Sequence, residues 1–219
     1  MSLTFFGHPI SSYCQKVLIA FYEYDIPFTW RLLAFGDEEA AAEFAALWPI
    51  KRMPVLVDDG QAIMEATIII EHLGLLHRGP VQLLPEDPKR AIHVRFLDRF
   101  FDNYVMTPMM RIVFDHLRPP EKRDSQGVSE SRSLLNTAYG WLETTLSDRS
   151  WAAGDDFSLA DCAAAPCLFY ADWVHSIGAE YPKLRAYRQR LLSRPSFARA
   201  VNEARPYRSL FPPGAPDRD

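Results

Sequence analysis

The chain of 219 residues is long enough for one large domain or two small ones, and its 48% hydrophobic and 24% charged residues are ordinary globular values. Its net charge of −4 excludes the strongly basic surface that attracts nucleic acid or an anionic membrane. No apolar run approaches the roughly 20 residues that span a bilayer, so we expect neither a membrane nor a nucleic-acid partner.

The cysteines and histidines narrow the class of protein further. Three cysteines, an odd number without a framework spacing, favour a reducing compartment, and we expect a cytoplasmic protein. The chain opens directly on a strand pattern, so we expect no signal peptide. The six histidines are scattered, and none forms an i, i+4 pair beside an acid, so we expect no metal site.

The first 77 residues mix strand and helix patterns. The strand patterns cover residues 3–6, 28–33, 54–57 and 61–64, and the helical patterns cover residues 12–24, 37–47 and 66–76. The strand–helix–strand order at the start predicts that the first two strands are parallel. Asp58-Asp59-Gly60 between the last two strands predicts a hairpin. The order βαβαββα predicts an α/β, thioredoxin-like domain, a four-stranded mixed sheet with helices on both faces.

Residues 78–88 form a proline-rich break that we interpret as a linker, and residues 89–219 are predicted to form an all-helical domain. The helical patterns cover residues 88–117, 134–142, 158–175, 181–192 and 195–201. Pro108 is expected to kink or split the first of these helices. A polar loop at residues 121–127 is expected before the second.

The turn between the first strand and the first helix carries hydroxyls at Ser11 and Ser12. A helix start directs backbone N–H groups and the positive end of the helix dipole at one spot, a position that suits a ligand's sulfur anion. Ser11 stands three residues before Cys14, at the position of the first cysteine in a redox turn. A serine cannot form a disulfide, so dithiol chemistry is excluded. A serine hydroxyl still donates to a thiolate. The alternative is that a serine only caps the helix and that Cys14 is a buried apolar residue.

Arg52-Met53-Pro54 stands just before the third strand. A proline that opens a strand can have a cis peptide bond, which turns the backbone of the preceding residue toward a ligand. The alternative is an ordinary edge-strand proline. Lys51 and Arg52 suit a ligand carboxylate, although most cations of this kind are simply solvated.

Glu65-Ala66-Thr67 begins the last helix of the first domain. An acid before a helix start suits the macrodipole, which is the structural interpretation. The functional interpretation is a zwitterion site, in which Glu65 binds a ligand ammonium and the N–H groups of Ala66 and Thr67 bind its carboxylate.

A stripe of methionine and aromatic side chains follows the long helix of the second domain. Its members are Tyr104, Met106, Met109, Met110 and Phe114. Such stripes suit adaptable apolar pockets, and we expect Tyr104, Met109 and Phe114 to bind a hydrophobic substrate. The alternative is that the stripe belongs to the core.

In this order, the motifs resemble those of the cytosolic glutathione transferase superfamily over nearly the whole chain. The matching motifs are Ser11-x-Tyr13-x-x-Lys16-Val17, Met53-Pro54-Val55-Leu56, the helix start at Glu65 and the capping box Phe157-Ser158-Leu159-Ala160-Asp161. The resemblance implies a thioredoxin-like glutathione-binding domain, an all-helical second domain, a homodimer and an active site between the domains. Ser11 matches the residue that activates the glutathione sulfur in serine-type members, with Ser12 as the nearest substitute.

The resemblance also implies further contacts with glutathione. By the same matching, Met53 pairs its backbone with the peptide of glutathione, Pro54 is cis, and Arg52 lies near the glycine carboxylate. Three positions depart from the family. Ala66 replaces a serine whose hydroxyl binds the γ-glutamyl carboxylate, a role that either the Thr67 hydroxyl or the backbone would then take. Trp48-Pro49-Ile50-Lys51-Arg52 stands where the family often has Asn-Pro-x-Gly-Lys, and Tyr13 replaces a cysteine of the branch that isomerises maleylacetoacetate.

We therefore predict a glutathione transferase that uses glutathione as co-substrate and no metal. Ser11 would hold the glutathione thiolate for attack on a hydrophobic electrophile. Two other functions stay open: a non-catalytic glutathione-transferase-like binding module, favoured by Ala66, and a glutathione-dependent isomerase, because the same thiolate serves both reactions. A glutathione-dependent reductase or peroxidase ranks lower, because that chemistry usually requires a cysteine in place of Ser11.

Overall fold

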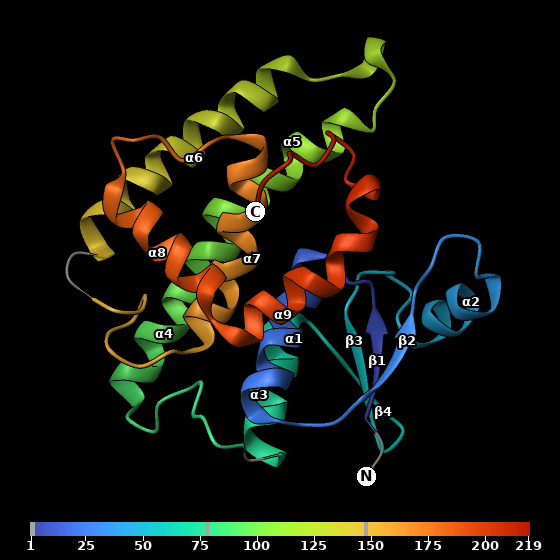
Figure 1. Cartoon of the computed structure of the whole chain (residues 1–219). Coiled ribbons are helices and arrows are strands. Elements are labelled where there is room, and N and C mark those ends of the chain that lie inside the picture. Colours follow the sequence, from blue (N-terminus) through green and yellow to red (C-terminus); the bar gives the residue numbers. More distant parts are fainter. Residues whose placement is uncertain (1–2, 78, 147–148) are drawn as a thin grey trace.

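The computed structural model describes residues 3–77, 79–146 and 149–219. A sheet with three helices occupies one side of the molecule, and the remaining helices form a bundle on the other (Figure 1). None of the helices described in these ranges has the length and apolar content needed to cross a bilayer. The predicted linker at residues 78–88 leads into a helix that begins at Pro88, although residue 78 lies outside the described part. The domain boundaries stay a prediction.

The N-terminal part has the predicted order of strands and helices. Its elements are β1 (Leu3–Gly7), α1 (Ser12–Tyr24), β2 (Thr29–Leu32), α2 (Glu38–Leu47), β3 (Val55–Asp58), β4 (Gln61–Met64) and α3 (Ala66–Leu76). The sheet order is β2-β1-β3-β4, with β1 and β2 parallel and the other two pairs antiparallel. This confirms the mixed four-stranded sheet and the hairpin.

The two faces of the sheet are covered by different helices. In Figure 1, α2 lies on the outer side of the sheet, and α1 and α3 lie between the sheet and the helical bundle. Successive side chains of β1 point to opposite faces. Phe6 packs with Phe44 of α2, whereas Phe5 packs with Phe21 of α1 at a ring distance of 5.4 Å. The side chains of this one strand therefore pack against the helices on both faces of the sheet.

Helix α1 is buried along most of its length. Residues 14–21 are all buried, including the polar Gln15 and Lys16, because α1 packs against the sheet, α3, and two helices of the second domain, α7 (Leu159–Val174) and α9 (Pro195–Ala204). The helix therefore belongs to the cores of both parts of the chain.

The second part is all-helical, as predicted. Its remaining elements are α4 (Pro88–Phe100), a π-helical segment (Phe101–Met106), α5 (Thr107–His116), a 3-10 turn (Pro120–Lys122), α6 (Ser125–Leu146), α8 (Pro182–Ser193) and a 3-10 turn (Arg205–Leu210). The capping box of α7 is present, since Ser158 donates its backbone N–H to Asp161 Oδ2 at 2.9 Å.

The predicted split of the first long helix is confirmed, and one other local prediction changes. Pro108 lies in the first turn of α5, directly after the π-helical segment, where a proline is tolerated because its missing N–H is not needed. The expected loop at residues 121–127 was wrong, since α6 already begins at Ser125. Asp124 Oδ1 accepts the N–H of Gly127 at 2.8 Å and so starts the helix earlier than the apolar pattern indicates.

Candidate functional site

The register of the sheet brings the predicted motifs to one edge. Phe6 lies opposite Val55, and Val55 lies opposite Met64. The segments that follow β1, precede β3 and follow β4 therefore leave the sheet at the same end. These segments carry Ser11, Met53-Pro54 and Glu65 respectively.

Ser11 is the N-cap residue of α1. Its backbone is extended, with φ −74° and ψ 123°, and its Oγ accepts the N–H of Cys14 at 3.4 Å. A hydroxyl that accepts one hydrogen bond keeps its own hydrogen for donation. The capping interpretation and the ligand interpretation of Ser11 are therefore compatible. Ser12 follows as the first helical residue and is half-buried.

Cys14 is fully buried on α1. Its Sγ accepts the backbone N–H of His8 at 3.5 Å, and burial raises the pKa of its thiol to about 11. At neutral pH the group stays a thiol and does not act as a nucleophile. A Cβ added at Gly7 would lie 2.7 Å from this sulfur, so only glycine fits there. This confirms Cys14 as a buried apolar residue.

The peptide bond between Met53 and Pro54 is cis. Met53 is half-buried and packs against the cores on both sides of the sheet, and Pro54 is buried. Arg52 and Lys51 are both exposed, beside this bond. The segment therefore presents the backbone of Met53 and two cations at the edge that Ser11 shares.

Glu65 is the N-cap residue of α3, with φ 70° and ψ 118°. A positive φ is uncommon for a residue other than glycine and costs about 1–3 kcal/mol. The side chain of Glu65 is exposed and makes no capping hydrogen bond. Its carboxylate therefore lies at the positive end of α3 without capping the helix, a position that agrees both with the macrodipole interpretation and with a ligand ammonium. Ala66 is buried behind it.

The hydroxyl of Thr67 is fully engaged within the protein. It accepts from Lys16 Nζ at 3.0 Å and from Arg99 Nη2 at 2.5 Å, and it donates to Asp98 Oδ2 at 3.0 Å. A hydroxyl has one hydrogen and two lone pairs, so none is left for a ligand. Thr67 therefore does not replace the serine hydroxyl that is missing at Ala66, and only its backbone N–H remains for a carboxylate.

The cluster around Thr67 joins the two parts of the chain. Lys16 Nζ lies 2.6 Å from Asp98 Oδ1 and 2.8 Å from Asp102 Oδ2, and its side chain is 1% exposed. Burial raises the pKa of Asp102, although Lys16 and Arg99 oppose this shift. The sequence offered one signal for the cluster, a lysine inside the apolar stretch of α1.

The predicted substrate stripe divides into two groups. Met106 and Met109 lie in the core, at 0% and 3% exposed, whereas Tyr104 and Phe114 are nearly half exposed. The burial of Met109 agrees with the core alternative, whereas the rings of Tyr104 and Phe114 are accessible, and the substrate contacts of all three residues stay a prediction. Tyr104 packs on Phe100 at a ring distance of 5.3 Å.

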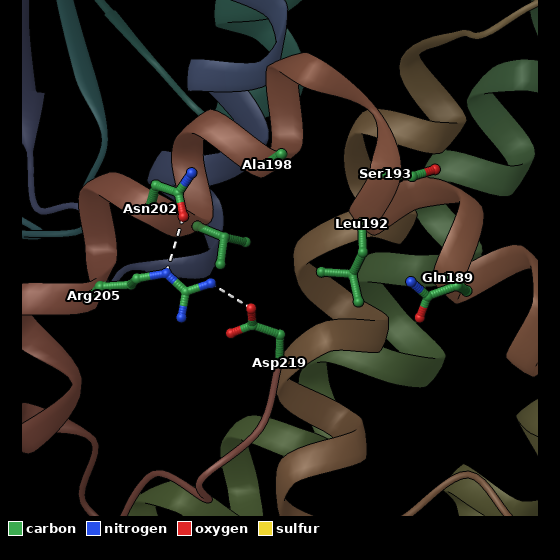
Figure 2. A pocket seen from close by; sticks show the side chains of 8 residues that line it. Gln189, Leu192, Ser193, Ala198, Asn202, Arg205 and Asp219 are labelled. Carbon is green, nitrogen blue, oxygen red and sulfur yellow. Dashed lines mark hydrogen bonds and ion pairs between the residues drawn. The ribbon is translucent and has the colours of Figure 1, made fainter.

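A separate cavity lies between α8, α9 and the C-terminus. Figure 2 shows its lining, where Arg205 contacts both Asn202 and Asp219. The cavity has a volume of about 240 Å³. None of the residues predicted for the site lines it, so it is distinct from the edge that carries Ser11.

The architecture is that of a thioredoxin-like domain followed by a helical domain, and family comparisons agree. The sequence model of the glutathione S-transferase N-terminal domain matches residues 5–81, and that of the C-terminal domain matches residues 105–195. The chain belongs to the cytosolic glutathione S-transferase superfamily.

The names of three relatives indicate three different functions. The chain is 27% identical over 206 residues to glutathione S-transferase GstB of Escherichia coli (91% of this chain, 97% of the relative). It is 26% identical to a probable maleylacetoacetate isomerase of Caenorhabditis elegans (90% and 91%). It is 29% identical to FtsZ-localized protein A of Caulobacter vibrioides (86% and 86%).

Solved structures share the fold. A glutathione S-transferase from Methylobacillus flagellatus, with GSH bound, has a TM-score of 0.82 and 26% identity, covering 91% of this chain and 98% of the other. One from Methylobacterium radiotolerans, in complex with glutathione sulfonate, has a TM-score of 0.80 and 27% identity, covering 92% and 95%. Both structures therefore hold glutathione or an analogue.

Proposed function

We propose that this protein is a glutathione transferase in which Ser11 holds the sulfur of glutathione as a thiolate. One observation carries the proposal: the strand register gathers Ser11, Met53-Pro54 and Glu65 at one sheet edge. Helices α1 and α3 both begin at this edge, and neither has an acidic residue in its first turn. The positive end of α1 therefore remains available to an anion, and that of α3 offers its backbone N–H groups to an anion beside the exposed carboxylate of Glu65.

Ser11 and the start of α1 stabilise the thiolate together. Ser11 Oγ accepts the Cys14 N–H and donates its hydrogen to the ligand sulfur. Lowering the pKa of the glutathione thiol by about two units corresponds to roughly 2.7 kcal/mol. A hydroxyl donor and a helix start are together of that size.

The remaining contacts orient glutathione along the edge. The backbone of Met53, beside the cis Pro54, pairs with the peptide of glutathione, and Arg52 binds its glycine carboxylate. Glu65 binds the ammonium of the γ-glutamyl group. The N–H groups of Ala66 and Thr67 bind the neighbouring carboxylate, without help from a side-chain hydroxyl.

The electrophile occupies the helical side of the site. The exposed rings of Tyr104 and Phe114 suit an apolar substrate. The thiolate attacks the substrate carbon, a C–S bond forms, and the leaving group departs with the electron pair. Burial of Cys14 argues against a reductase, because its thiol does not reach the thiolate form at neutral pH.

Replacement of Ser11 by alanine tests the proposal. We expect Ser11→Ala to lower kcat for an aromatic halide by about tenfold to a thousandfold, the effect of losing one catalytic donor. Asp37→Ala is the matched control, since Asp37 caps α2 through Ala40 N–H at 2.9 Å. Both variants lose a cap worth about 1 kcal/mol, and only Ser11→Ala loses turnover. An unchanged rate in Ser11→Ala, or a loss confined to Ser12→Ala, rejects Ser11 as the activator.

A second candidate is a non-catalytic binding module. It is favoured by the engaged Thr67 hydroxyl next to Ala66, which leaves the γ-glutamyl carboxylate without a hydroxyl donor. Retention on immobilised glutathione together with conjugation of an aromatic halide supports the transferase. Failure of both supports the module.

A third candidate is a glutathione-dependent isomerase. The relative from Caenorhabditis elegans is named as a probable maleylacetoacetate isomerase. There the thiolate adds to the substrate and leaves again, so glutathione is needed but not consumed. Measuring glutathione consumption per product separates the two reactions.

We also propose that the protein forms a homodimer and lies in the cytoplasm. Five apolar side chains on α3 and α4 are at least 48% exposed: Ile68, Leu75, Leu76, Ile92 and Phe96. A second copy of the chain would cover them. The three cysteines are buried and free, which suits a reducing compartment.

A further inference from the structure

Two imidazoles and one carboxylate converge at the end of the sheet opposite Ser11. Asp58 ends β3, His72 lies on α3, and His77 is the C-cap residue of α3. Asp58 Oδ2 lies 2.8 Å from His72 Nε2 and 2.9 Å from His77 Nε2. His77 is about 16 Å along α3 from Ala66, so the cluster is distinct from the glutathione edge.

We propose that Asp58, His72 and His77 bind a divalent transition-metal ion of the zinc class. The three side chains each offer one ligand atom, and these atoms all lie within 4.8 Å of one another. Imidazole nitrogen and carboxylate oxygen are the usual non-thiolate ligands of Zn²⁺. Three protein ligands leave a fourth, open position for water.

The geometry requires only small adjustments. Ligand atoms about 2.0–2.2 Å from a tetrahedral zinc are separated by roughly 3.3–3.5 Å. The two nitrogen–oxygen distances of 2.8 and 2.9 Å would lengthen by about half an ångström. The two histidine nitrogens lie within 4.8 Å of each other, so their separation would change by about 1.5 Å at most.

The surroundings allow an ion to enter and to be held. The side chains of His72, His77 and Asp58 are 17%, 12% and 11% exposed. A site of this kind is open enough for exchange, yet poor enough in water to strengthen coordination. A bound ion would tie the C-terminal end of α3 to the end of β3.

The competing interpretation is a cluster held by hydrogen bonds alone. There both imidazoles carry a proton on Nε2 and donate to Asp58. Metal binding instead uses both Nε2 lone pairs, so the two interpretations differ in whether an ion binds with defined stoichiometry.

Cobalt and zinc titrations of the full chain decide between them. The protein is prepared without a polyhistidine tag and treated with a chelator. We expect Co²⁺ to give the visible absorption of a four-coordinate site at one ion per chain, and Zn²⁺ to displace it. We also expect Zn²⁺ to raise the Tm of the wild type.

Variants assign the ligands. His72→Ala and His77→Ala are each expected to raise the Kd for Co²⁺ at least tenfold, and Asp58→Asn, which keeps the shape of the side chain, is expected to do the same. His116→Ala, at an exposed position on α5, is the matched control and keeps wild-type binding. Circular dichroism confirms that the variants are folded. No four-coordinate absorption in the wild type, or equal binding by all variants, overturns the proposal.

Discussion

The two halves of the proposed site are built in different ways. The glutathione half consists of strand ends and helix starts, whose positions follow from the pairing of Phe6 with Val55 and of Val55 with Met64. The electrophile half consists of side chains on α5 and the π-helical segment before it, and their facing depends on one widened turn. Backbone groups define the first half and side chains define the second.

The buried cluster of Lys16 joins these halves, and removing its charge is expected to have the largest effect. Lys16→Met leaves the buried Asp98 and Asp102 without their buried cation and with only the half-exposed Arg99, which destabilises by about 3–5 kcal/mol. Urea unfolding measures the loss. The exposed Lys89→Met on α4 is the control and should remain near wild type. A loss below about 1 kcal/mol would show that the cluster does not hold the halves together.

Within the electrophile half, Met109 belongs to the core and Tyr104 to the proposed pocket. Met109→Ala is expected to destabilise the fold by about 2–5 kcal/mol, because the side chain is 3% exposed. Tyr104→Ala should destabilise by only about 1 kcal/mol, because the ring is 47% exposed and packs on Phe100, and should raise KM for the electrophile. Thermal unfolding and steady-state kinetics on both variants check this. The opposite pattern would place Met109 in the pocket.

The strand ends and helix starts of the proposed glutathione half were predictable from sequence because local patterns define them, whereas the glutathione contacts of their residues stay a prediction. Alternating apolar residues predicted the strands, and hydroxyls at Ser11 and Ser12 predicted a helix start. Pairing the strands then brought three motifs together without further information. The same reasoning placed Cys14 in the core, as the structure confirms.

Contacts between distant elements were not predictable in this way. The Thr67 hydroxyl is engaged by Lys16 from α1 and by Asp98 and Arg99 at the end of α4, and no local pattern links these elements. Asp58 likewise meets two histidines that are separated from it by a hairpin and a helix. Side-chain clusters of this kind require the tertiary structure.

Restoring the missing hydroxyl at position 66 is expected to have a small effect on the affinity for glutathione. Ala66→Ser supplies a donor at the start of α3 for the γ-glutamyl carboxylate. A net hydrogen bond of about 0.5–1.5 kcal/mol corresponds to roughly two- to tenfold tighter binding of glutathione. Isothermal titration calorimetry measures this change. Weaker binding in Ala66→Ser would mean that glutathione does not lie against this helix start.

The pKa of the bound glutathione thiol, followed by thiolate absorbance against pH, tests the role of Ser11 most directly. In the wild-type complex we expect a pKa about two units below the value near 8.5 of a free thiol. In Ser11→Ala we expect the pKa to return close to that value. The same lowered pKa in both proteins would contradict the proposal that the Ser11 hydroxyl holds the thiolate.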